Sequence, residues 1–251
     1  MKIRLLAGVI LGVFVMTGCN LNPVTETTPQ GKLRTETARF VGGENVSLTT
    51  EDAIRLDANF FPANGDVAVV LAHMGIADQT SWWAFASESA QAGIAALIFD
   101  FRCYGKSECR QGVAAETSMT DVLTAIRTLR DKGYQRIVCI GASMGASACL
   151  QASMQVDLAG LVFIAGDREI ILNGKWYPDD IVNPDMLKLF IVAEQDPYSI
   201  AVGDTQRYYR DSPEPKQLIL YPESVHGTDL FATPSGSKFH QALMDFLLAI
   251  R

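Results

Sequence analysis

Apolar and polar positions alternate along this chain in two regular patterns. Short, almost continuous runs of Val, Leu, Ile and Ala are typical of strands that are buried on both faces of a parallel sheet. Longer segments with apolar residues three and four positions apart are typical of amphipathic helices. Strands are predicted over residues 67–72, 94–100, 137–140, 158–164, 187–193 and 217–221, and helices over residues 81–92, 118–132, 144–154 and 239–250.

Two further apolar segments, residues 46–48 and 54–60, are closed by Pro62 and the turn sequence Asn64-Gly65. We interpret them as an antiparallel pair of strands. Because the later strands alternate with helices, the predicted fold class is α/β, a doubly wound and mostly parallel sheet with helices on both faces. Only about twenty residues lie between positions 167 and 187, which is too few for a large cap domain.

The amino-terminal segment is predicted to be an export signal. Lys2 and Arg4 precede an apolar run over residues 5–16, which is too short to span a bilayer as a resident helix. The sequence Met16-Thr17-Gly18-Cys19 follows, and it is similar to the lipobox of bacterial lipoproteins, whose cysteine becomes the lipid-modified first residue of the cleaved protein. An ordinary secretory signal and an uncleaved anchor are the alternatives, and each of them also takes the protein out of the cytosol.

We therefore expect three parts: a signal peptide of the lipoprotein type over residues 1–18, a flexible tether over residues 19–40, and one α/β domain over residues 41–251. The tether is rich in Thr, Pro, Gln and charged residues and has no apolar period. The expected location is the bacterial cell envelope, with membrane attachment only through a lipid on Cys19.

Composition narrows the possible partners. The chain has 251 residues, 48% of them hydrophobic, which is enough for one sizeable core. Its formal net charge is -7 and it has no cluster of Lys and Arg interleaved with aromatic residues, so nucleic-acid binding is not expected. The sequence leaves the oligomeric state open.

Four cysteines remain after Cys19, and an oxidising compartment permits them to form disulfides. Cys103 and Cys109 lie in one polar loop, and their bridge is the first choice. Cys139 and Cys149 are interpreted as two buried, small apolar side chains. Neither spacing indicates a zinc site, and no metal or organic cofactor is expected.

The sequence Gly141-Ala142-Ser143-Met144-Gly145 carries the strongest chemical signal. It follows a predicted strand and opens a predicted helix, which is the context of a nucleophile elbow with Ser143 at its tip. The two glycines let neighbouring backbones approach closely. A glycine-rich turn with a capping serine is the alternative interpretation.

Three other segments add to the elbow. They are Leu71-Ala72-His73-Met74-Gly75, the segment from Phe99 to Ser107 with Asp100 and Arg102, and the tail from Asp196 to His226-Gly227. In these four segments the chain resembles an α/β-hydrolase, and compact dienelactone-hydrolase-like and esterase members are the most similar.

The resemblance implies a Ser-His-Asp triad. His226 follows the last strand, where the family carries its base, whereas His73 is expected to support a loop and His240 falls inside the last helix. Asp196 follows the penultimate strand and is the implied acid; Glu194 and Asp167 are the competitors.

The family also supplies two backbone N–H groups that bind an oxyanion. These correspond to Met144, the residue after the nucleophile, and to Gly75, with Met74 or Ile76 as alternatives. Met74 replaces the glycine that is usual there. The resemblance also implies that Asp100 and Arg102 form a structural ion pair, and Cys103 stands where glycine is common.

The expected function is hydrolysis of a carboxylic ester of a small-molecule acyl substrate through an acyl-enzyme. The same triad serves amide or thioester cleavage and acyl transfer. An alternative from another class is a catalytically inactive envelope lipoprotein that binds a ligand or partner. A product assay with added alcohol acceptors separates transferase from hydrolase, and ligand binding without turnover distinguishes the inactive form.

Overall fold

The computed structural model describes residues 42–110, 118–166 and 183–251. The predicted signal peptide and tether, with Cys19, lie outside the described residues. So do Asp167 and most of the short segment before residue 187.

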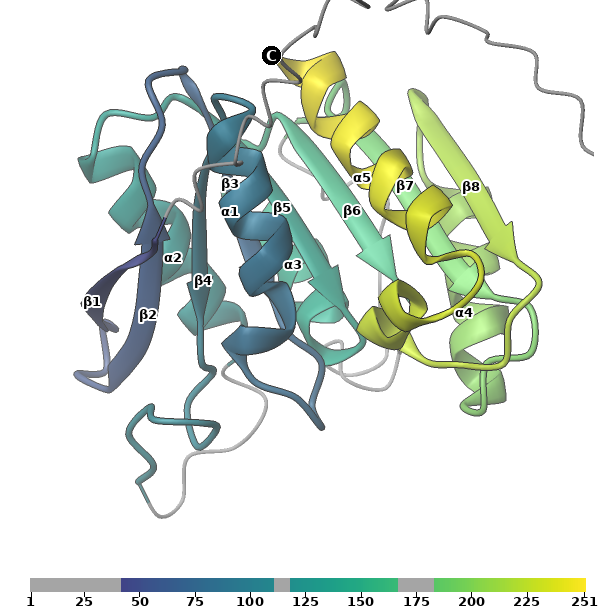
Figure 1. The fold of residues 1–251 in the computed structure, drawn as a ribbon, viewed down its shortest axis with the longest axis horizontal. Helices are drawn as coiled ribbons and strands as arrows, with labels where there is room; N and C mark the ends of the chain where they lie inside the picture. Colours follow the sequence, from purple (N-terminus) through teal and green to yellow (C-terminus); the bar gives the residue numbers. More distant parts are fainter. Residues whose placement is uncertain (1–41, 111–117, 167–182) are drawn as a thin grey trace, which may run out of the picture. The chain divides into compact units, whose positions relative to one another are not determined.

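Eight strands form one sheet in the order β1-β2-β4-β3-β5-β6-β7-β8 (Figure 1). The first two strands are antiparallel to their neighbours, and all later pairings are parallel. The strands are β1 (Glu44–Thr49), β2 (Arg55–Phe61), β3 (Val67–Ala72), β4 (Ala95–Phe99), β5 (Arg136–Ala142), β6 (Gly160–Ile164), β7 (Leu187–Ala193) and β8 (Lys216–Tyr221).

Helices cover both faces of this sheet, so the predicted fold class is confirmed. Helices α1 and α5 lie on the near face in Figure 1, and α2, α3 and α4 lie behind the sheet. None of the helices in the described ranges is long and apolar enough to cross a membrane. The helices are η1 (Gln79–Trp82), α1 (Trp83–Gln91), α2 (Ser118–Asp131), α3 (Met144–Ser153), α4 (Ser199–Asp211), η5 (Gly227–Ala232) and α5 (Gly236–Ile250).

Strand alternation explains why the central strands read as unbroken apolar runs. In β3, Val69 and Leu71 pack toward α1 and α5, while Val70 packs toward α2 and α3. Every residue of β3, β4 and β6 is buried. A strand that is buried on both faces needs apolar side chains at even and odd positions alike.

Helix α4 is the longest element of the described chain that was not predicted from the sequence. Its sequence is polar, it contains Gly203, and only Ala201, Thr205 and Tyr208 are buried. With such a narrow apolar stripe, the helical period is difficult to distinguish from a polar loop.

The cysteines form two disulfides, one predicted and one not. Cys103 and Cys109 are bonded, as expected from their shared loop. Cys139 and Cys149 are both fully buried, but they are also bonded, so their interpretation as two separate apolar side chains is wrong. The physical reason is strand alternation: Cys139 points to the face of β5 that α3 covers, and Cys149 lies on α3.

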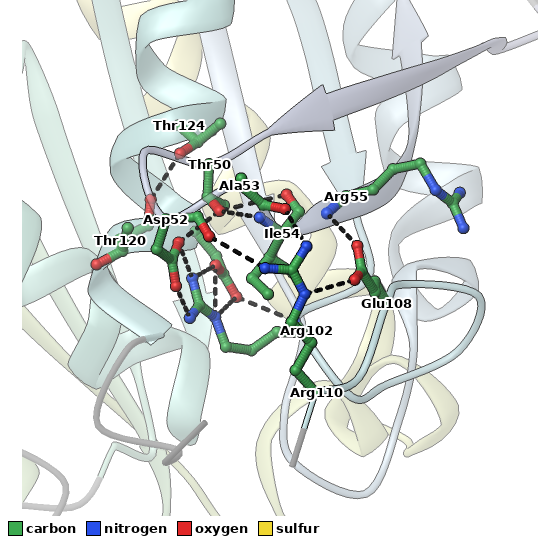
Figure 2. A network of polar contacts seen from close by, with 11 residues as sticks. Thr50, Asp52, Ala53, Ile54, Arg55, Arg102, Glu108, Arg110, Thr120 and Thr124 are labelled. Atoms are coloured by element: carbon green, nitrogen blue, oxygen red, sulfur yellow. Dashed lines mark hydrogen bonds and ion pairs between the residues drawn. The ribbon is translucent and has the colours of Figure 1, made fainter. Parts of the chain in front are cut away.

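The expected ion pair between Asp100 and Arg102 is also wrong. Arg102 instead donates from Nη2 to Oδ1 of Asp121 at 2.7 Å and from Nη1 to Oδ2 of Asp52 at 2.8 Å (Figure 2). Asp100 accepts the backbone N–H groups of Gln79 and Lys106, both at 2.9 Å. The aspartate therefore organises the loops after β3 and β4, and the arginine ties β4 to α2 and to the β1–β2 turn.

Burial makes the Arg102–Asp121 pair structurally important. The side chains of Arg102 and Asp121 are 3% and 0% exposed. Asp52, which is 45% exposed, has its pKa lowered to about 2 because Arg102 and Thr50 donate hydrogen bonds to its carboxylate.

We predict that Arg102→Ala lowers the free energy of unfolding by about 3–5 kcal/mol, because it leaves the Asp121 carboxylate buried without its cation. Urea titration followed by circular dichroism measures this loss. Arg110→Ala is the matched control, since Arg110 pairs with Glu108 at the surface (Figure 2) and its removal should cost less than about 1 kcal/mol. Equal losses for the two variants would contradict the prediction.

Candidate active site

Ser143 occupies a sharp turn between β5 and α3. Its backbone has φ 52° and ψ -116°, a left-handed conformation that is unusual for a residue with a side chain. A Cβ atom on Gly141 would lie 2.2 Å from the Gly145 carbonyl oxygen, and one on Gly145 would lie 2.3 Å from the Ala72 carbonyl oxygen. Both positions therefore require glycine, and the turn has the geometry of a nucleophile elbow.

His226 and Asp196 are brought together from the loops after β8 and β7. Nδ1 of His226 lies 3.0 and 2.9 Å from the two carboxylate oxygens of Asp196. The Asp196 side chain is fully buried and that of His226 is 8% exposed. Because a carboxylate only accepts hydrogen bonds, Nδ1 carries a proton and Nε2 is the nitrogen left for chemistry.

Backbone hydrogen bonds hold the two loops in this register. Glu194 N–H donates to the Tyr221 carbonyl at 2.8 Å, and Gln195 N–H donates to the Glu223 carbonyl at 3.0 Å. Asp196 also accepts the Tyr198 N–H at 2.9 Å, so its carboxylate is fixed from two sides.

Ser143 and His226 line the same cavity, which has a volume of about 220 Å³. No hydrogen bond joins these two side chains in the structure of the described residues. A nucleophile and its base are often too far apart to hydrogen-bond before substrate binds. The cavity is lined by Met74, Gly75, Ile76, Ser143, Ala165, Tyr198, Ile200, Ala201 and His226.

The expected oxyanion donors lie beside this cavity. Met144 is the first residue of α3, where a backbone N–H has no partner within the helix and negative charge is favoured. Gly75 lines the cavity, and so do its alternatives Met74 and Ile76.

Gly227 explains how Met74 can stand where glycine is usual. It has φ +54°, which favours glycine, and a Cβ there would lie 2.9 Å from the Met74 sulfur atom. The bulky Met74 is therefore accommodated where the loop carrying His226 has no side chain.

Two of the competing residues, Glu194 and His240, are not part of this pair. Glu194 is exposed, and His240 pairs with Glu88 on α1, with 2.6 Å between Nε2 of His240 and Oε2 of Glu88. Asp167 lies outside the described residues. Among the acids that the structure describes, Asp196 alone bonds to His226.

His73 has the supporting position that was expected. Its Nε2 accepts the Phe101 N–H at 3.1 Å, so Nδ1 carries the proton and donates to the Met74 carbonyl at 2.8 Å. The neutral ring thereby links the loop after β3 to the loop after β4. Burial lowers the pKa of His73, which keeps this arrangement uncharged.

Four residues of the cavity were not anticipated: Ala165, Tyr198, Ile200 and Ala201. The Tyr198 ring packs edge-to-face on His226, with 4.6 Å between ring centroids. Its position two residues after Asp196 was the only available signal. Ile200 lies on the unpredicted helix α4, so its place in the cavity could not be predicted.

No group of three or more His, Cys, Asp or Glu side chains within the described ranges is arranged to hold a metal ion. The site is instead built from a hydroxyl, an imidazole and a carboxylate. Such groups together can activate an alcohol as a nucleophile.

Comparison with known proteins identifies the family. The model of the alpha/beta hydrolase family matches residues 69–248, which is most of the chain. The chain belongs to the alpha/beta hydrolase family.

Relatives of this alpha/beta hydrolase include the uncharacterized protein YfhR of Escherichia coli (strain K12). The two are 23% identical over 233 residues, which cover 82% of this chain and 81% of YfhR. The fold of this chain is similar to that of the Pyrococcus furiosus esterase Pf2001 (TM-score 0.68, 19% identity, covering 90% of this chain and 94% of that chain). A thermophilic esterase from Thermogutta terrifontis is also similar (TM-score 0.64, 18% identity, 82% of this chain and 99% of that chain).

The lowered pKa of His73 predicts a pH dependence of stability in this hydrolase. In the unfolded chain His73 takes up a proton near the ordinary histidine pKa of about 6.5, whereas in the folded chain its pKa is lower. The contribution of His73 to the free energy of unfolding is therefore complete above this pH and is lost as the pH falls below it. Urea titrations at pH 7.5 and 5.5 should show a smaller loss on acidification in His73→Gln than in the wild type. Equal losses would contradict the prediction.

Proposed function

We propose that this alpha/beta hydrolase is a serine esterase that cleaves a carboxylic ester through an acyl-enzyme. One observation carries the proposal: Ser143, at the tip of a strained elbow, faces the same cavity as His226, whose far nitrogen is held by the buried Asp196. Two esterases of similar fold add support.

In the first half-reaction His226 Nε2 takes the proton of the Ser143 hydroxyl as the oxygen attacks the ester carbonyl. The tetrahedral intermediate places its oxyanion against the N–H groups of Met144 and Gly75. The imidazolium then gives its proton to the leaving alcohol, which leaves the acyl group on Ser143. In the second half-reaction His226 deprotonates a water molecule as that water attacks the acyl-enzyme. The imidazolium then returns the proton to the Ser143 oxygen as the acid is released.

Asp196 acts through His226 in this scheme. Its buried carboxylate fixes the tautomer with the proton on Nδ1 and stabilises the imidazolium that forms during each step. Its second hydrogen bond, from the Tyr198 N–H, keeps the carboxylate from rotating away from the ring.

We also infer that the protein is exported and anchored to the cell envelope by a lipid on Cys19. The two disulfides of the catalytic domain support an oxidising compartment, because cytosolic proteins rarely keep such bonds. Radiolabelled palmitate should be incorporated into the wild type and not into Cys19→Ser. Equal labelling of the two proteins would remove the inference.

We predict that a fluorophosphonate probe labels the wild type and does not label Ser143→Ala, because the probe reacts only with an activated serine. Ser237→Ala, which changes an exposed serine on α5, is the control and should label normally. Labelling of Ser143→Ala, or no labelling of the folded wild type, would overturn the proposal.

We predict that Asp196→Asn lowers kcat by about 10³- to 10⁴-fold while the fold is retained, because an amide no longer holds the productive tautomer. Steady-state kinetics with a chromogenic ester measure this. Glu194→Gln, two residues earlier and exposed, should stay within about twofold of the wild type. Similar losses in both variants would refute the assignment of Asp196.

A further inference from the structure

The rim of the candidate active site is unusually apolar. Only five large hydrophobic residues are exposed in the described parts of the chain, and three of them line the catalytic cavity. They are Ile76, Tyr198 and Ile200, which are 73%, 52% and 45% exposed. A cluster of exposed apolar side chains next to a cavity marks a binding surface rather than chance.

The three residues come from two separate elements. Ile76 lies in the loop after β3, and Tyr198 and Ile200 lie at the start of α4. All three share the cavity with Ser143 and His226, so the rim is continuous with the reacting groups. A chain attached to the reacting carbonyl therefore meets this surface as it leaves the cavity.

The interior of the cavity is equally short of charge. Its buried lining residues Met74, Ala165 and Ala201 are apolar, and no Lys, Arg, Asp or Glu is among the described residues that line it. A charged substrate group placed among these described residues would meet no oppositely charged side chain and would lose part of its hydration, which is costly. An uncharged group would not meet this cost.

The cavity is also small. Its volume of about 220 Å³ is below the range of roughly 300–1,000 Å³ that is typical of pockets for drug-sized ligands. The cavity therefore suits a short group, and a longer chain extends onto the rim.

We propose that Ile76, Tyr198 and Ile200 form a subsite for the aliphatic chain of an uncharged ester, which is the substrate class of this enzyme. This inference rests on the proposed esterase function and specifies its substrate. Ile76 and Ile200 determine chain-length preference. Tyr198 also contacts His226, so its substitution would mix binding with positioning.

The test compares p-nitrophenyl acetate, butyrate and hexanoate with the anionic p-nitrophenyl hemisuccinate. For the wild type, kcat/KM should be higher for butyrate and hexanoate than for acetate, and roughly tenfold or more lower for hemisuccinate than for butyrate. The double variant Ile76→Ser/Ile200→Ser shortens two side chains and keeps every backbone N–H that could bind the oxyanion. It should lose roughly tenfold in kcat/KM for hexanoate and less than about twofold for acetate.

The matched control is Leu220→Ser/Leu248→Ser, which removes the other two exposed large hydrophobic residues, on β8 and α5. It should leave the chain-length profile unchanged. Fluorophosphonate labelling of Ser143 in every variant verifies that the catalytic groups are intact.

An unchanged hexanoate-to-acetate ratio in the rim variant, with labelling and acetate turnover retained, would overturn the subsite while leaving the esterase proposal standing. Equal turnover of hemisuccinate and butyrate would do the same. If the folded wild type neither labels nor hydrolyses any of these esters, the esterase proposal fails and the subsite fails with it.

Discussion

The close approach of three backbone segments around Ser143 is the constraint on which the rest of the site depends. Strand β5 must turn into α3 within one residue, while the first turn of α3 passes against the end of β3. Two glycines make this approach possible, and Ser143 accepts a left-handed conformation as a result. Because the helix begins at the next residue, the serine lies beside the N–H of Met144, which has no partner within the helix.

The parallel sheet then brings the other groups to the same edge. Loops that follow parallel strands all emerge at the carboxyl ends of those strands, so the loops after β3, β7 and β8 are neighbours of the elbow. His73 braces one of these loops against the segment after β4 with a neutral ring. The remaining two are joined by backbone hydrogen bonds, which bring Asp196 and His226 together.

Much of this arrangement could be predicted from the sequence, because the central strands are buried on both faces and therefore have strong apolar patterns. Because the ends of these strands could be recognised, the glycines around Ser143 and the positions of Asp196 and His226 after successive strands could be interpreted as loop positions at one edge of the sheet. Helix α4 was missed because its buried stripe is narrow, and the apolar rim residue Ile200 was missed with it. The pairing of Arg102 with Asp121 and the bond between Cys139 and Cys149 depend on which face each side chain occupies and which helix covers it, and spacing alone does not specify this.

The covalent bond between Cys139 and Cys149 gives the nucleophile turn a property that packing alone does not provide. It closes a ring of chain that contains Ser143, with the incoming strand and the outgoing helix as its two sides. If α3 detaches transiently from the sheet, its first two turns remain tied to the strand that carries the serine. During local opening the bond therefore limits how far α3 can separate from β5, and Ser143 returns to the same position when the helix packs again.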